Sequence, residues 1–356
     1  MTDPTGLTGL QKATIPIAAM DIGSLTIRLA IAEIGADWPN LRLIHTKREI
    51  THLGQGLVRS GSLTPEAMAR SLAVLAEFNQ DLQRYEVAAA RAVATQAVRQ
   101  ARNRPAFLEQ IYQQTGLRVE VLSPEQEARL SLAGVLSVLT PAEDNRPVVV
   151  FDVGGGSTEW ALLLPGESPR FTSLPMGAST LTQRYLASDS PSNADLAALR
   201  TRIQRHLSRL AETFFPESGL KARPRLVGTA GTVTTLGAMF LGMRIYQPQK
   251  INNLVLTRST VDRLAGQMAA LTEAERAALP GLEPGKAGVI VAGALIIQEI
   301  LEFFQQACLT VIDAGLLEGV LLQIAKEISS SKNYDKIDKI ILVGELNDPR
   351  SEHHRV

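Results

Sequence analysis

The sequence predicts an α/β protein made of two similar halves that enclose a central cleft. Short apolar strands alternate with helical stretches in both halves, which is typical of α/β domains. One pattern also occurs twice: an apolar strand ends in aspartate and glycine, and a second strand returns after a hydroxyl residue. It begins at Asp21 and again at Asp152. A chain of 356 residues is long for one core, so we expect two domains.

The expected domain boundary falls at residues 140–147, where two prolines and three charged residues are typical of a linker. We expect a first domain over residues 1–140 and a second over 141–312. A terminal helix over 313–330 is expected to pack back on the first domain. Residues 331–356 form a polar tail that we expect to be weakly ordered.

In the first half, a Gly-Ser pair between two apolar runs predicts a hairpin. Thr64-Pro65-Glu66 predicts a helix start, because threonine caps, proline suits the first helical position and glutamate suits the positive helix end. The further elements expected in this half are strands at Ile17–Met20, Leu25–Ile34, Leu41–Ile50, Glu86–Ala92 and Arg118–Leu122, and a helix at Arg99–Thr115.

A capping box at Ser123 to Gln126 predicts a helix that runs to about Leu139. After the linker, strands and helices alternate again. The strands expected there are Val148–Phe151, Glu159–Leu164, Arg225–Val227 and Leu309–Ile312, and the helices are Pro191–Phe215, Val233–Leu241, Val261–Leu271, Lys286–Gln306 and Leu316–Ser329.

Composition limits the possible partners and the compartment. The 36 basic and 36 acidic side chains balance, which argues against a general DNA-binding protein. No run of about 18 apolar residues occurs, and no secretory leader is evident, so we expect a cytoplasmic protein without a membrane span. The single cysteine, Cys308, excludes an intrachain disulfide, and we expect it to be a small buried apolar residue.

The two aspartate–glycine turns are candidate phosphate and metal sites. Backbone N–H groups freed by glycine bind phosphate oxygens, and a strand-end carboxylate can hold a hard cation. Asp21 and Asp152 facing each other across a cleft would form such a site. Asp152 is the stronger candidate, because Gly154, Gly155, Gly156 and Ser157 follow it. The alternative is a pair of ordinary hairpin turns.

A third turn of small residues, Gly228 to Thr232, lies between an expected strand and an expected helix. N–H groups at a helix start attract anions, although a plain helix entry would have the same composition. Neither a Walker A motif nor a dinucleotide fingerprint occurs in any of these turns.

Two glutamates and one arginine are candidates for the chemistry itself. Glu127 lies near the start of a capped helix, whose dipole favours the charged form that a general base needs. Glu159 follows the triple-glycine turn on a strand that should border the cleft. By residue chemistry alone, either could be a solvated surface acid. Arg91 follows a strand and could bind phosphate with two hydrogen bonds or form a structural salt bridge.

Several segments recur together in one family and in the same order. They are AAMDIGSLTIRLAIAE from Ala18, RAVATQAVRQARN from Arg91, SPEQEARLSLAG from Ser123, VFDVGGGSTEWAL from Val150, MGAST from Met176, GTAGTVTTLGAM from Gly228, VIVAGALI from Val289 and IDAGLLEGVLL from Ile312. Over roughly Ala18 to Leu322, the sequence resembles a short, two-domain member of the exopolyphosphatase/guanosine-pentaphosphatase (Ppx/GppA) family. The resemblance implies two actin-like, ribonuclease H-like ATPase-fold domains of the sugar kinase/Hsp70/actin superfamily around a central cleft.

The resemblance also implies residue roles. Glu127 activates the attacking water, Glu159 assists it, and Asp21 and Asp152 hold Mg²⁺ or Mn²⁺. The positions implied for phosphate contact are Ser24, Arg91, Gly154, Gly155, Gly156, Ser157, Gly228, Thr229, Gly231 and Thr232. This sequence departs from the family at Leu25, where asparagine is frequent.

The implied activity is release of terminal orthophosphate from inorganic polyphosphate. Hydrolysis of guanosine pentaphosphate is the alternative within the same chemistry, and a phosphotransferase on the same fold is an alternative outside it. A third hypothesis is a sensor that binds these ligands without turnover. The expected partners are therefore polyphosphate or a phosphorylated guanosine nucleotide, with neither DNA nor membrane, and a homodimer is possible.

Overall fold

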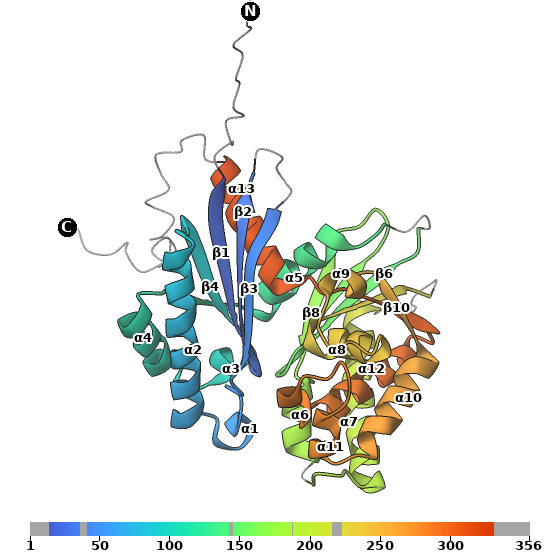
Figure 1. Ribbon diagram of the computed structural model, residues 1–356. Helices are drawn as coiled ribbons and strands as arrows, with labels where there is room; N and C mark the ends of the chain where they lie inside the picture. The colour runs from blue at the N-terminus through green and yellow to red at the C-terminus, as the bar shows by residue number, and fades with distance from the viewer. Residues whose placement is uncertain (1–13, 36–40, 142–144, 187, 216–222, 331–356) are drawn as a thin grey trace, which may run out of the picture.

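The computed structural model describes residues 14–35, 41–141, 145–186, 188–215 and 223–330, which form two lobes side by side (Figure 1). Each lobe is built on one mixed β-sheet. The strand order is β3-β2-β1-β4-β5 in lobe I and β10-β11-β9-β6-β7-β8 in lobe II. The expected polar tail lies outside the described residues.

The sheet of lobe I has a different helical layer on each face. Its strands are β1 (Ile15–Ile22), β2 (Thr26–Ile34), β3 (Leu41–Ile50), β4 (Ala89–Ala94) and β5 (Val119–Val121). Alternate residues of β1 point to opposite faces. Ala18 and Met20 pack with the cluster that includes α2 (Pro65–Arg84) and α4 (Arg104–Thr115). Ile17 and Ala19 pack with α13 (Leu316–Ser330).

Lobe II contains the larger hydrophobic core, which is packed against its sheet. Its strands are β6 (Val148–Val153), β7 (Thr158–Leu163), β8 (Arg170–Leu174), β9 (Arg225–Thr229), β10 (Leu254–Thr257) and β11 (Cys308–Val311). The longer helices around it are α6 (Ala178–Tyr185), α7 (Asn193–Phe214), α8 (Ala230–Phe240), α10 (Arg258–Ala269) and α12 (Ile290–Phe303). α12 is almost wholly buried, and none of the described helices is both long and apolar enough to span a bilayer.

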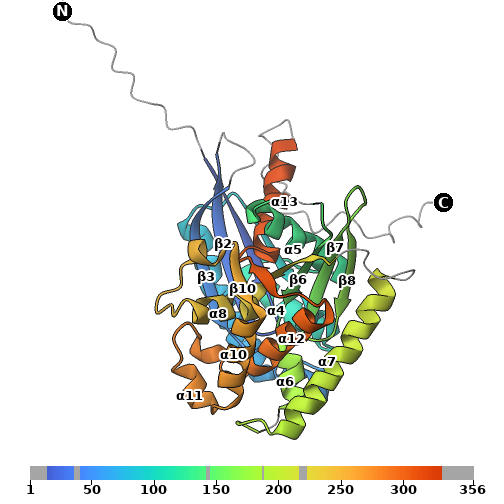
Figure 2. The same ribbon diagram turned by 90° about the vertical axis from the view of Figure 1, so that its right-hand side faces the viewer.

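The lobes are connected through two crossing helices, α5 (Pro124–Val138) and α13, which lie side by side in Figures 1 and 2. α13 covers the sheet of lobe I, whereas Leu132 and Val135 of α5 pack with the sheet of lobe II. The helices approach closely because both have glycine at the crossing. A Cβ on Gly134 would lie 1.9 Å from the carbonyl oxygen of Gly315, and no structure tolerates that contact.

Local signals for helix starts were accurate. Thr64 Oγ1 accepts a hydrogen bond from Ala67 N at 3.2 Å, and the capping box at Ser123 is complete. The helix predicted over 99–115 ends where expected, at Thr115, but its predicted start is wrong. The chain forms α3 (Gln96–Gln100) and then α4, with Pro105 in the first turn of the second helix.

Some elements and one burial prediction were missed. The sequence did not predict β8, α6, β10 or the short elements α1 (Leu57–Ser60), α9 (Pro248–Ile251), α11 (Glu273–Ala277) and η1 (Pro284–Lys286). The burial predicted for Cys308 is wrong. It is exposed, because it is the first residue of β11 and only the following three are buried.

Candidate active site

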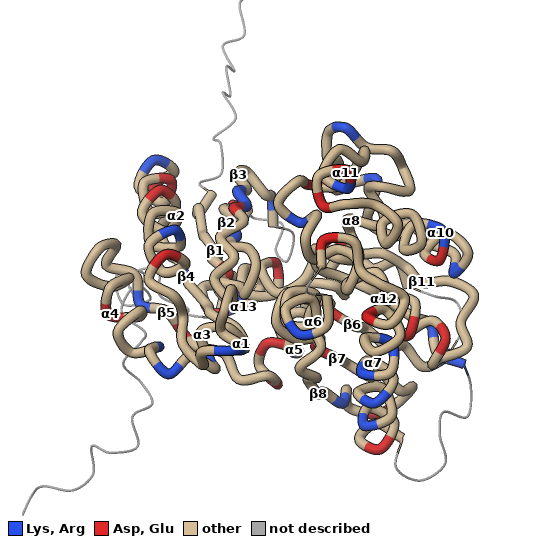
Figure 3. The backbone as a smooth tube through the Cα atoms, turned by 90° about the horizontal axis from the view of Figure 1, so that it is seen from below, with Lys and Arg blue, Asp and Glu red and all other residues tan. Residues whose placement is uncertain are grey.

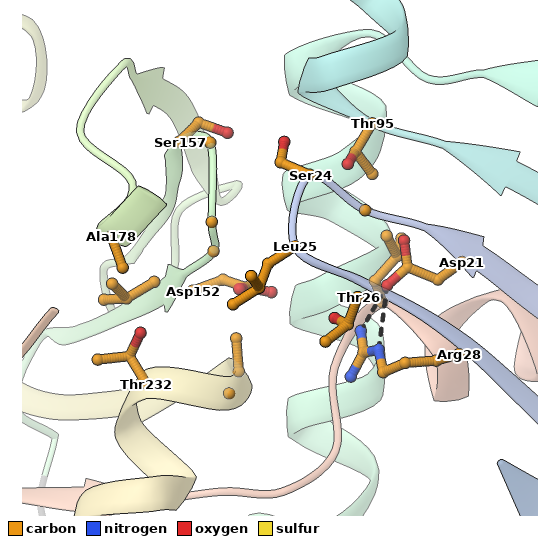
Figure 4. A pocket seen from close by; sticks show the side chains of 18 of the residues that line it. Asp21, Ser24, Leu25, Thr26, Arg28, Thr95, Asp152, Ser157, Ala178 and Thr232 are labelled. Atoms are coloured by element: carbon orange, nitrogen blue, oxygen red, sulfur yellow. Dashed lines mark hydrogen bonds and ion pairs between the residues drawn. The ribbon is translucent and has the colours of Figure 1, made fainter. Parts of the chain in front are cut away.

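One pocket between the lobes collects most of the predicted site residues (Figure 4). It encloses about 110 Å³. The turn after β1, the turn after β6 and the start of α8 all open into it. The predicted residues that line it are Asp21, Ser24, Glu127, Asp152, Gly154, Gly155, Gly156, Ser157, Glu159, Gly231 and Thr232.

Arg91 does not line this pocket, in contrast to the expectation of a phosphate contact there. Its guanidinium binds both carboxylate oxygens of Glu327 on α13, at 3.0 and 3.2 Å. The register of β4 explains this position, because Arg91 pairs with Ala19 and only Val93 is level with Asp21. The alternative of a structural salt bridge is the one observed.

Gly228 and Thr229 do not line the pocket either. A Cβ on Gly228 would meet the ring of Phe151 at 2.8 Å, so this glycine permits close packing behind the turn. Thr229 Oγ1 donates a hydrogen bond to the carbonyl oxygen of Ala314 at 2.8 Å. Both residues shape the turn, whereas Ala230, Gly231 and Thr232 line the pocket.

The strand pairs place different residues opposite the two aspartates. In lobe I, Asp21 on β1 pairs with Arg28 on β2, and in lobe II, Asp152 on β6 pairs with Glu159 on β7. Arg28 donates to Asp21 Oδ2 from Nε at 3.1 Å and from Nη2 at 2.7 Å. Asp152 Oδ2 instead accepts a hydrogen bond from Ser131 Oγ at 2.6 Å.

Glu127 is buried, only 7% exposed, which excludes a solvated surface acid. Arg99 Nη1 donates to its Oε2 at 2.9 Å and also binds the carbonyl oxygen of Leu122. Burial raises the pKa of Glu127 well above its usual range, the charge of Glu159 adds to this, and Arg99 opposes it. The helix start was expected to favour the charged form, but desolvation has the larger effect.

Glu159 is also buried and is held by two hydroxyl groups. Ser157 Oγ and Ser173 Oγ donate to its Oε1 at 2.6 and 2.8 Å. Burial and the charge of Asp152 raise the pKa of Glu159 to about 7. Glu127 and Glu159 are therefore two buried acids on one pocket with raised pKa values, and the pKa of Glu159 lies near neutral pH, where acid–base catalysis can use it.

The two glycine turns meet across the cleft. A Cβ on Gly156 would lie 1.7 Å from Gln96 Oε1 and 2.5 Å from Ser24 Oγ, both in lobe I. A side chain at position 156 would therefore displace Gln96 and Ser24 where the lobes approach. Leu25 also lies in this contact, since a Cβ on Gly155 would be 3.0 Å from the Leu25 Cβ. The apolar side chain of Leu25 thus lies between the two turns (Figure 4).

The start of α8 combines backbone strain with a buried cation. Ala230 has a φ of 68°, a left-handed conformation that is uncommon for a residue with a Cβ and often occurs at functional sites. Lys286 lies beside this turn, with its Nζ 3.3 Å from the position of a Cβ on Gly231. Burial and the charge of Arg48 lower the pKa of Lys286 to about 8.

Sequence reasoning missed the cations of the pocket, which are Arg28, Arg48 and Lys286, and also Arg99 behind Glu127. A signal for Arg99 existed. It lies on a short helix that begins directly after β4, and the predicted helix over 99–115 hid that start.

A hard divalent cation fits this set of donors. Asp21 Oδ1 is buried without a hydrogen-bond partner, which is unusual for a carboxylate oxygen, and Asp152 lines the same pocket. Within the described residues, no three acidic, histidine or cysteine side chains are grouped to hold a metal unaided. Mg²⁺ characteristically binds through one or two carboxylates together with substrate phosphates, so two aspartates suffice.

The fold and the pocket define a class of protein. Two α/β lobes joined by crossing helices match the fold of solved Ppx/GppA proteins. Residues 30–328 match the model of the Ppx/GppA phosphatase family. The chain belongs to this family.

Individual relatives agree with this assignment. Exopolyphosphatase 2 of Mycobacterium tuberculosis is 32% identical over 320 residues, which cover 87% of this chain and 98% of that protein. The structure of the Ppx/GppA family member of Aquifex aeolicus has a TM-score of 0.72 at 32% identity, over 90% of this chain and 100% of that chain. An exopolyphosphatase from Cytophaga hutchinsonii has a TM-score of 0.78 at 27% identity, over 88% and 98% of the two chains.

Proposed function

We propose that the protein is an exopolyphosphatase that releases terminal orthophosphate from inorganic polyphosphate. One observation carries the proposal: Glu127 and Glu159, two buried acids with raised pKa values, face a glycine-rich cradle between the lobes. The family membership supports phosphohydrolysis, and relatives named exopolyphosphatases support the choice of substrate.

In the proposed reaction, a water molecule attacks the terminal phosphorus and Glu127 accepts its proton. The free oxygen for this proton is Oε1, because Arg99 binds Oε2. A P–O bond to the water oxygen forms while the anhydride P–O bond breaks, and its electron pair stays on the shortened chain. The products are orthophosphate and a chain one unit shorter.

The surrounding residues orient the phosphates and balance their charge. N–H groups of Gly155 and Gly156, with the hydroxyls of Ser24 and Ser157, line the position of the terminal phosphoryl group. Lys286 is placed for the next phosphate, beside the start of α8. Mg²⁺ or Mn²⁺ at Asp152 and Asp21 Oδ1 would neutralise charge on the phosphoryl oxygens.

Glu159 is the second acid of the proposed mechanism. Its two serine hydrogen bonds fix the carboxyl group, and a pKa of about 7 allows it to hold or release a proton at neutral pH. We assign it the role of assisting Glu127, since its charge state changes the pKa of the base.

A phosphate-release panel tests the proposal. We expect Mg²⁺-dependent release from polyphosphate in preference to guanosine pentaphosphate. We expect E127Q to lower the rate about 10²- to 10⁴-fold, the usual contribution of a general base. E125Q is a matched control on the same helix, because Glu125 is exposed and pairs with Arg129.

Each competing hypothesis has its own result. A preference for guanosine pentaphosphate would replace the substrate and keep the chemistry. ADP formation that depends on an acceptor would indicate a phosphotransferase. Tight binding of polyphosphate without turnover in the presence of Mg²⁺ would indicate a sensor, and near wild-type activity of E127Q would remove Glu127 as the base.

A further inference from the structure

Four arginines on two neighbouring helices form a basic surface outside the pocket. Arg202, Arg205 and Arg209 follow one another at intervals of three and four residues on α7, so they share one side of the helix. Arg184 lies in the last turn of α6, which packs against α7. Figure 3 shows Lys and Arg residues on both helices. We call these four residues the arginine stripe.

The arginine stripe has no acidic partner within the part of the chain that the structure describes. Arg200 on the same helix differs, because it binds Glu299 and Gln298. Like charges three or four residues apart destabilise a helix. The stripe therefore does not contribute to the stability of α7, which points to a ligand of opposite charge.

His206 is the second, independent observation. It lies on α7 among these arginines and is only 1% exposed, yet neither ring nitrogen has a hydrogen-bond partner. Arg202 Nε is also buried without a partner. Burial, together with Arg202, Arg209 and Arg184, lowers the pKa of His206 to about 4. Buried polar groups are normally satisfied, so these unpaired nitrogens are unusual. The arginines create a positive potential at His206, which an anion bound at the surface would offset.

We propose that the arginine stripe binds the part of a polyphosphate chain that extends out of the cleft. This inference rests on the proposed function. α6 connects the two sites, since its first residue, Ala178, lines the pocket and Arg184 lies about 9 Å further along the helix at 1.5 Å per residue.

The composition of the stripe favours polyphosphate over single-stranded nucleic acid. The exposed residues of α7 around it are Thr201, Gln204, Arg205, Ser208, Arg209, Glu212 and Thr213, so one acid lies among the cations and hydroxyls and none of these residues is aromatic. Nucleic-acid sites of this kind generally stack bases on aromatic side chains, whereas a chain of phosphates needs only cations and hydroxyls. Guanidinium groups bind phosphate oxygens with two hydrogen bonds, which suits such a chain.

Direct binding to the E127Q protein tests the proposal without turnover. The ligands are a polyphosphate of several hundred units and tripolyphosphate, which is too short to reach both sites. We expect R205Q/R209Q to reduce the ratio of long-chain to tripolyphosphate affinity at least tenfold. The slope of log Kd against log salt should fall by about 1 to 2, because fewer counterions are released. Both substituted residues are exposed, so folding is preserved.

R42Q/R118Q is the matched control, since it removes two exposed arginines of lobe I. We expect it to leave the affinity ratio unchanged. An equal loss in the control would show that net charge alone matters and would overturn the proposal. An unchanged ratio in R205Q/R209Q would do the same.

The imidazole NMR signals of His206, assigned with H206Q, provide a local readout. We expect them to shift with long polyphosphate and to stay in place with tripolyphosphate. A single-stranded RNA that binds the same arginines more tightly than polyphosphate would overturn the choice of occupant. If polyphosphate binding depends on these arginines but the wild-type protein releases no phosphate from polyphosphate, the proposed function is refuted and the proposed binding site is retained.

Discussion

The two aspartate hairpins have the same geometry and opposite electrostatics. In each, the partner across the strand pair lies seven residues after the aspartate in the sequence, as Arg28 for Asp21 and Glu159 for Asp152. In lobe I, a cation therefore lies opposite the acid. Lobe II sets two acids against each other, an arrangement that costs stability in a sheet. Arg28 thus offsets the charge of Asp21 in lobe I, whereas Asp152 and Glu159 lie side by side in lobe II. We propose that the first arrangement contributes more to stability and the second more to chemistry.

Removal of the two aspartate charges gives the largest expected contrast. We expect D152N to lower phosphate release by about 10² or more, through lost metal binding, with little loss of stability. D21N should instead lower the free energy of unfolding, by roughly 1–3 kcal/mol, because Arg28 loses the partner of a largely buried pair. Thermal unfolding and Mg²⁺ titrations of activity measure the two effects.

D152N and D21N also test whether the two hairpins differ in their electrostatics. If Asp21 holds the metal as strongly as Asp152, both variants will need more Mg²⁺ for half-maximal activity. If the loss of stability in D152N equals that in D21N, lobe II has no specialised electrostatics. E120Q is a control for a charge change alone, because Glu120 is exposed on β5 and lies outside the pocket.

Arg99 is expected to have an intermediate effect, through Glu127. Arg99 lowers the pKa of Glu127, so R99M raises that pKa further. A general base acts in its deprotonated form, and the rising limb of the pH–rate profile should therefore move to higher pH. At neutral pH we expect a loss of about tenfold or more, partly from the lost orientation of the carboxylate.

The shape of the pH–rate profile distinguishes the effect of the Arg99 charge from the effect of its hydrogen-bond geometry. R99K keeps the charge and loses one of the two contacts of Nη1, so it should restore the rising limb more fully than the maximal rate. A fall in rate at every pH with no displacement of the limb would contradict the assigned role of Arg99.

The sequence revealed the acids and glycines of the site because each lies in a local pattern. Asp152, the glycines after it and the capped helix of Glu127 need only a few neighbouring residues to be recognised. Those patterns also predicted the two-lobed fold, since alternating strands and helices require little long-range information. The roles of these residues in metal binding and catalysis stay predictions.

What the sequence could not reveal depends on register and burial. Arg91 lies within β4, and Arg99 lies on the helix that follows it. The sequence does not show which of them is near the pocket. The pairing of Arg91 with Ala19 shows that Arg91 lies two residues before the level of Asp21. The opposition of Asp152 and Glu159 also needs a strand register. Burial reversed one local expectation, because desolvation of Glu127 outweighs the helix start that favours its charge.

Arg91 is expected to have the smallest effect and completes the contrast between the lobes. Its partner Glu327 is 40% exposed, and solvent screening makes such pairs weak. We therefore expect R91Q to change the free energy of unfolding by about 0–1 kcal/mol and to leave the kcat and KM of phosphate release at wild-type values. Chemical denaturation and a phosphate-release assay measure both. A large rise in KM would mean that Arg91 reaches substrate despite its place on β4. Because E327Q removes the same ion pair from the other side, an equal effect of the two variants would locate that change in the packing of α13 rather than in phosphate binding.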